Sequence, residues 1–89
     1  MTDVLIDGNV TENREMLHDA FASQLSLPEW YGRNLDALFD CLTDIHEETA
    51  VHIVNGDRLK ENLGNMYNGL VKVLGRAEKE NSFIKVYYE

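Results

Sequence analysis

With 89 residues, of which 44% are hydrophobic, the chain is long enough for one globular domain with an apolar core and too apolar for a disordered one. Its net charge of −8 argues against direct binding to nucleic acid, and no apolar run approaches the roughly 18–20 residues that a membrane-spanning helix needs. Composition therefore predicts a single small domain, residues 1–89, that binds neither nucleic acid nor membrane.

The first predicted elements are a strand and a helix. Residues 4–6 form a short apolar run, and residues 7–9, Asp-Gly-Asn, supply the turn that closes it. Thr11 is expected to cap the helix that follows. The inward face of this helix repeats at helical spacing and comprises Met16, Leu17, Ala20, Phe21 and Leu25.

A loop then leads into a second helix. Pro28 disfavours helix just before it, and Gly32 permits a backbone turn. Asn34 is a good cap for the second helix, which we expect to extend toward Glu48. Its buried stripe would be Leu35, Leu38, Leu42 and Ile45.

The remainder is predicted to form a strand, two helices and a last strand. Residues 50–54 are a strand stopped by Asn-Gly, and Asp57 is expected to cap a short helix that Gly64 ends. Its inward residues are Leu59 and Leu63, and those of the fourth helix are Tyr67, Leu70, Val71 and Leu74. Residues 83–88 close the chain as a strand.

Helical stretches separate the strands, which favours parallel pairing because parallel strands need long crossovers. We therefore expect an α/β fold in which about four helices pack on a three-stranded parallel sheet.

The only cysteine, Cys41, and the first seven residues indicate where the protein works. A single cysteine cannot form an internal disulfide, which fits a reducing compartment. Residues 1–7 include two acids and lack the basic start and apolar stretch of a secretion signal. We expect a cytoplasmic protein.

The negative charge is concentrated in the first half of the chain. Residues 1–50 hold 11 acids against two arginines, a net charge of −9, whereas residues 51–89 hold five acids and six bases, a net charge of +1. Such asymmetry is typical of a surface that meets a cationic partner. The alternative is an acidic surface that serves solubility.

Within the second helix, Asp36, Asp40 and Asp44 recur every four residues and line one stripe. Like charges at this spacing destabilise a helix by roughly 0.2–0.5 kcal/mol per pair, and aspartate is a poor helix former. Only Asp36 lies in the first turn, where the helix dipole favours an anion. The stripe therefore indicates either a surface that binds a partner or a plain solvated face.

Three aromatic residues, Trp30, Tyr31 and Phe39, surround the stripe in the sequence. Phe39 lies off the buried stripe, so its ring is expected to be partly exposed. Interfaces favour aromatic anchors beside charged groups. Trp30 and Tyr31 could instead fold back onto the core.

Catalytic and metal-binding patterns are weak. No desolvating element surrounds Asp36 and Asp40, and the acids beside Cys41 would raise the pKa of its thiol, which suits an inert buried cysteine. The three histidines lack metal-ligand spacing, and no phosphate-binding glycine loop occurs. We expect no enzyme activity, no catalytic residues, no metal and no cofactor.

Residues 27–42, Leu-Pro-Glu-Trp-Tyr-Gly-Arg-Asn-Leu-Asp-Ala-Leu-Phe-Asp-Cys-Leu, resemble the barstar family. The run joins a proline loop, a Tyr-Gly turn, an asparagine cap and two aspartates spaced by four. Elsewhere the resemblance is looser but follows the same order of elements. It implies a small three-stranded parallel sheet packed by helices, and an immunity protein that inhibits a secreted, barnase-like ribonuclease inside the cell that makes it.

The resemblance also implies roles for individual residues. Asp40 would be the central carboxylate in the phosphate site of the nuclease, and Asp36 would pair with a basic group near its guanine site. Trp30 stands where the family has a tyrosine that packs on the catalytic histidine, and Phe39 where it has a tryptophan. The full expected partner-binding set is Trp30, Gly32, Arg33, Asn34, Asp36, Phe39, Asp40, Thr43, Asp44 and Arg76.

The chain departs from the family pattern at four positions. Arg33 and Arg76 replace acids, Ile45 replaces a tryptophan, and Ser82 replaces a second cysteine. A nuclease that is basic opposite the two arginines would be repelled, so the expected partner is a small basic ribonuclease that differs from barnase at those points.

The predicted mechanism is substrate mimicry, in which helix aspartates occupy the places of phosphate oxygens. The protein would be a monomer or one half of a one-to-one complex. The alternatives are an acidic interaction module that binds a cationic protein other than a nuclease, and a small enzyme that uses Asp36, Asp40 or Cys41.

Overall fold

The computed structural model describes all residues, 1–89. Its three strands form one parallel sheet in the order β1-β2-β3. The strands are β1 (Thr2–Asp7), β2 (Thr49–Val54) and β3 (Ile84–Tyr88). The helices are α1 (Arg14–Gln24), α2 (Leu35–Thr43), α3 (Gly56–Leu63) and α4 (Met66–Glu80). The predicted α/β fold, with a three-stranded parallel sheet and four helices, is confirmed.

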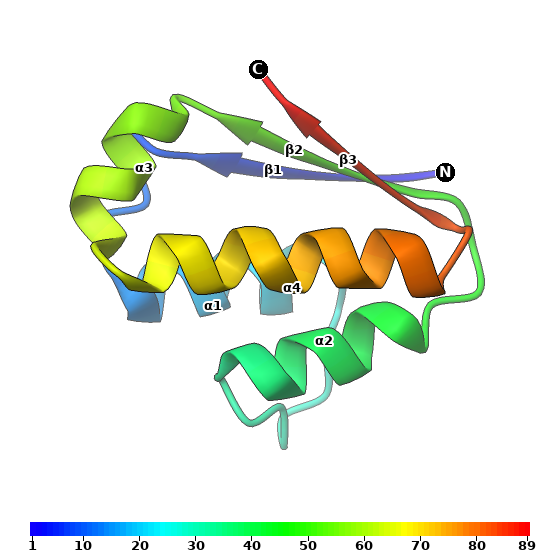
Figure 1. Cartoon of the computed structure of the whole chain (residues 1–89). Helices are drawn as coiled ribbons and strands as arrows, with labels where there is room; N and C mark the ends of the chain where they lie inside the picture. Colours follow the sequence, from blue (N-terminus) through cyan, green and yellow to red (C-terminus); the bar gives the residue numbers. More distant parts are fainter.

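Helices α1, α2 and α4 lie to one side of the sheet (Figure 1). Helices α1 and α4 run along its inner face, α3 lies at its end, and α2 packs against α4 farther from the strands (Figure 1). The outer face has no covering helix, so Leu5 and Tyr87 are 52% and 49% exposed. None of the helices has the length and apolar character needed to cross a membrane.

The core lies between the inner face of the sheet and the helices. Alternate strand residues point into it, as expected for a sheet with one wet face. The fully buried apolar strand residues are Val4, Ile6, Val51, Ile53 and Ile84. They meet Leu17, Phe21, Leu38, Leu42, Leu70 and Leu74 from the helices.

Two predicted helix caps are wrong. Asn13, and not Thr11, caps α1, because its side-chain oxygen accepts a 2.9 Å hydrogen bond from the backbone N–H of Met16. Thr11 is buried in the preceding turn, where its carbonyl accepts a hydrogen bond from Asn62. Asp57 lies in the first turn of α3, and the cap position belongs to Asn55, which is left-handed and makes no side-chain cap bond.

Several predicted inward residues are less buried than expected. Met16 is 38% exposed, since Leu17 and Phe21 fill the inward face of α1. Tyr67 and Val71 are half-buried, and Ala77 completes the buried face of α4. In the buried stripe predicted for α2, Leu35 at one end and Ile45 at the other are only half-buried. Helix α2 also ends at Thr43, and β3 begins one residue later than predicted, at Ile84.

Candidate partner-binding site

Helix α2 is held rigidly from its first residue. Asn34 caps it as predicted, since its side-chain oxygen accepts a 2.8 Å hydrogen bond from the N–H of Ala37. The amide nitrogen of Asn34 donates to the carbonyl of Gly32, 3.3 Å away, which ties the cap to the preceding turn. Leu38 and Leu42 are fully buried, so the opposite face of the helix points to solvent.

That exposed face carries the aspartate stripe, Asp36, Asp40 and Asp44. None of the three carboxylates takes part in an ion pair of the fold. Asp36 lies in the first turn of α2 and Asp44 at its C-cap, while Asp40 lies between them. The fold therefore leaves the charge of the stripe uncompensated and available to an outside cation.

The two aromatic residues of the loop take opposite positions. Trp30 is 83% exposed, whereas Tyr31 is only 6% exposed and folds back onto the core. The Tyr31 hydroxyl and Nδ1 of His18 share a 2.6 Å hydrogen bond. Burial raises the pKa of Tyr31 to about 12. Tyr31 is therefore the anchor of the loop, and its neighbour Trp30 projects into solvent.

His18 itself is a residue that the sequence patterns did not single out. It is 1% exposed, and its second ring nitrogen, Nε2, is buried without a hydrogen-bond partner. Burial, together with the nearby charges of Arg14 and Arg33, lowers the pKa of His18. Protonation would place a positive charge on a buried ring whose Nε2 has no acceptor, so the folded state favours neutral His18.

Arg33 connects the loop to α1 through hydrogen bonds. Its backbone is left-handed, with a φ of 54°. One guanidinium nitrogen, Nη2, donates to Oδ1 of Asp19 at 2.7 Å and to the carbonyl oxygen of Glu15 at 3.0 Å. The hydrogen bond to Asp19 is the main reason that the pKa of Arg33 is raised. Because two acids of α1 already compensate its charge, Arg33 repels a cationic partner far less than its position in the sequence indicates.

On the other side of the stripe, Arg76 of α4 lies against Phe39 of α2, with its guanidinium carbon 4.5 Å from the ring centre. Phe39 is half-buried, in agreement with the predicted partly exposed ring. The hydroxyl of Thr43 donates to the carbonyl oxygens of Phe39 and Asp40, so it is bound within its own helix. The fold thus brings Arg76, which is distant in the sequence, against Phe39, the neighbour of Asp40.

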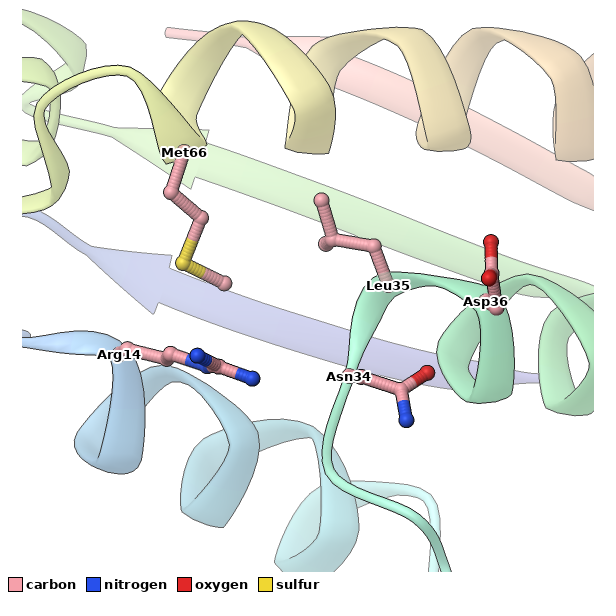
Figure 2. A pocket seen from close by; sticks show the side chains of 5 residues that line it. All are labelled: Arg14, Asn34, Leu35, Asp36 and Met66. Carbon is pink, nitrogen blue, oxygen red and sulfur yellow. The ribbon is translucent and has the colours of Figure 1, made fainter.

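A hollow of about 340 Å³ opens at the other end of the stripe, where α1, α2 and α4 begin. Figure 2 shows its lining residues, Arg14, Asn34, Leu35, Asp36 and Met66. Gly69 of α4 allows Leu35 to form its floor, because a Cβ at Gly69 would lie only 2.8 Å from Cδ1 of Leu35. Only the packing of three separate helices creates this hollow, and no sequence pattern indicated it.

The cysteine and the histidines considered for catalysis or metal binding lie on different elements of the fold. Cys41 is half-buried, whereas the sequence predicted a buried cysteine. Burial, together with Asp40 and Asp44, raises the pKa of its thiol. His52 is on the outer face of the sheet, where Nδ1 lies 2.6 Å from Oε2 of Glu89. No group of three or more His, Cys, Asp or Glu side chains is arranged to hold a metal ion.

Comparison with known proteins gives matches over nearly the whole chain. A sequence model of the family described as "Barstar (barnase inhibitor)" matches residues 1–88. A curated relative from Bacillus subtilis (strain 168), named "Putative ribonuclease inhibitor YrdF", is 37% identical over 81 residues. That match covers 90% of this chain and 89% of the relative. Both matches include the loop and helix that carry the candidate site.

Proposed function

This chain belongs to the barstar family, and we propose that it is a cytoplasmic inhibitor that occludes the active site of a small basic ribonuclease. The family match and the name of the curated relative point to inhibition of a ribonuclease and not to an enzyme. The proposed target is a secreted, barnase-like nuclease.

The observation that carries the proposal concerns two carboxylates, Asp36 and Asp40. Both are exposed on the outward face of a capped helix, and neither forms an ion pair within the fold. A ribonuclease active site holds cationic groups where RNA phosphates bind. Carboxylates presented at that spacing can accept charge-assisted hydrogen bonds from arginine or lysine, which are stronger than neutral ones. The inhibitor would thereby replace the phosphate oxygens of the substrate and cover the cleft.

Rigidity strengthens such binding, because little conformational freedom remains to be lost. The Asn34 cap fixes the start of α2, and the burial of Leu38 and Leu42 fixes its rotation. The hydrogen bond between Tyr31 and His18 fixes the loop that presents Trp30. An exposed tryptophan beside a charged stripe is a typical interface anchor. We assign Trp30 the contact with the rim of the nuclease active site.

A ribonuclease inhibition assay tests this function. The parent protein is titrated against barnase and a panel of other small basic bacterial ribonucleases, with hydrolysis of a fluorogenic RNA substrate as the readout. We expect stoichiometric, one-to-one loss of activity with at least one nuclease. Tight binding to a cationic protein with no loss of RNA hydrolysis would instead support the acidic interaction module.

A further inference from the structure

We propose that the hollow between α1, α2 and α4 receives a protruding apolar side chain of the ribonuclease, next to an acidic group of the same enzyme that pairs with Arg14. The proposal rests on the proposed function and adds a specificity determinant to it. It assigns to the partner a carboxylate at the margin of its otherwise cationic surface.

The small size of the hollow suits a side chain better than a free small molecule. Its volume of about 340 Å³ is at the lower end of the roughly 300–1,000 Å³ of small-molecule sites. Leu35 and Met66 are the hydrophobic residues of the lining, and they would contact an inserted apolar side chain. Methionine is flexible and polarisable, so it adapts to an inserted group. Because Asp36 belongs both to the stripe and to the lining, a partner that contacts Asp36 also reaches the hollow.

The charges around the hollow specify its occupant. Arg14 takes part in no ion pair of the fold, and its side chain extends from the start of α1 toward the hollow (Figure 2). Asp36, from α2, supplies the opposite charge of the lining. A cationic group of the nuclease placed over Asp36 would be repelled by Arg14 unless a carboxylate accompanied it. A partner with an acid beside its basic centre therefore complements the site, and a uniformly basic one does not.

Charge reversal at Arg14 tests the pairing, with Lys85→Glu as the matched control. Both changes alter the net charge equally, but Lys85 is exposed on β3, in register with Ala50 of β2 and away from the helices. Toward a basic nuclease, the added negative charge alone strengthens binding in both variants. Arg14→Glu should instead weaken inhibition about tenfold to a hundredfold, because it places two acids together in the complex.

The fold should tolerate Arg14→Glu, since an acid in the first turn of a helix interacts favourably with the helix dipole. Thermal unfolding of each variant verifies this. Met66→Trp provides an independent second variant, because an indole would fill the hollow without a change of charge. It should weaken inhibition about tenfold or more, since insertion of the partner's side chain would be blocked.

The measured quantity is the inhibition constant against the ribonuclease that the parent protein inhibits most strongly in the panel. Weaker inhibition by Arg14→Glu and Met66→Trp, with Lys85→Glu equal to or stronger than the parent, supports the proposal. If Arg14→Glu and Lys85→Glu strengthen inhibition to the same extent, the carboxylate opposite Arg14 does not exist. Unchanged inhibition by Met66→Trp refutes insertion into the hollow. A parent protein that inhibits none of the nucleases overturns the proposed function, and this inference with it.

Discussion

The guanidinium carbon of Arg76 lies 4.5 Å from the centre of the Phe39 ring, so a cation of α4 covers an aromatic ring of α2 next to Asp40. A cation–π contact at an exposed site stabilises by about 0.5–1 kcal/mol. Arg76 also approaches Glu80, one helical turn later, at 3.9 Å. The departure from the family pattern at this position is therefore built into the packing of two helices and places a positive charge at the rim of the proposed interface.

The first prediction concerns this rim charge. Arg76→Glu should strengthen inhibition of barnase about threefold to tenfold, because it replaces a cation by an acid opposite a basic nuclease. Inhibition of the protein's own target should weaken or stay unchanged, provided that this target is less basic there. The measurement is the inhibition constant of Arg76→Glu, compared with that of the parent protein, for both enzymes. Equal strengthening with both enzymes would show that Arg76 does not determine specificity.

The second prediction concerns the pH dependence of folding. Since the pKa of His18 is lowered in the folded state, the unfolded state binds the proton first as the pH falls below about 6.5. This histidine should make the free energy of unfolding fall with pH by up to about 1.4 kcal/mol per pH unit until its folded pKa is reached. His18→Phe should flatten that part of the profile, as measured by urea unfolding between pH 5 and 8.

His52 is the matched control, because its pKa is shifted the other way. Hydrogen bonds to Glu89 and Asp3 raise the pKa of His52, so its contribution is complete below about 6.5 and is lost as the pH rises through the folded value. His52→Gln should therefore change the profile between about pH 6.5 and the raised folded pKa of His52. A profile that His18→Phe leaves unchanged would mean that the buried ring does not remain neutral.

Much of the fold followed from sequence periodicity, and the errors have a common physical cause. Thr11 and Asn13 are both good caps, and what decided between them was the burial of Thr11 beside Asn62, a residue far away in the chain. Likewise, Trp30 and Tyr31 are adjacent aromatic residues of one loop. Tyr31 turns inward, where its hydroxyl meets Nδ1 of His18 on α1, a contact that the loop sequence does not indicate.

The candidate site was predictable where it lies on one element and unpredictable where it joins several. The outward stripe of α2 and its Asn34 cap followed from spacing within a single helix. The compensation of Arg33 by Asp19, and the hollow beside Arg14, depend on which helices lie next to one another. Local sequence patterns contain no information on that packing.

The third prediction concerns association kinetics. The stripe is unpaired in the fold, and 11 of the 16 acids lie in the first 50 residues, so this charge should steer a basic partner toward α2. The association rate should fall about tenfold or more between 10 and 150 mM salt, as the Debye length shrinks from roughly 30 to 8 Å. Stopped-flow mixing with the inhibited ribonuclease measures it. A rate that is insensitive to salt would show that the acidic surface does not guide docking.

The fourth prediction isolates the central carboxylate. Asp40 is exposed, forms no ion pair, and has like charges four residues away on either side. Asp40→Ala should therefore leave the thermal stability of the free protein unchanged or slightly higher. Asp40→Ala should weaken inhibition strongly, and Asp36→Ala should weaken it less. Glu48→Ala is the matched control, because this exposed acid lies beyond the end of α2 and should have little effect on inhibition.

The most direct test of the proposed mechanism is the inhibition constant of Asp40→Ala, measured against the ribonuclease that the parent protein inhibits and compared with thermal unfolding of the same variant. Loss of one partner of a buried charge pair costs about 2–5 kcal/mol, a range based partly on barnase–barstar itself, which corresponds to a roughly thirtyfold to several-thousandfold weaker complex. We predict a loss of that size with unaltered unfolding. A variant that unfolds far more easily yet inhibits as well as the parent would contradict the mechanism, because the stripe would then serve the fold and not the partner.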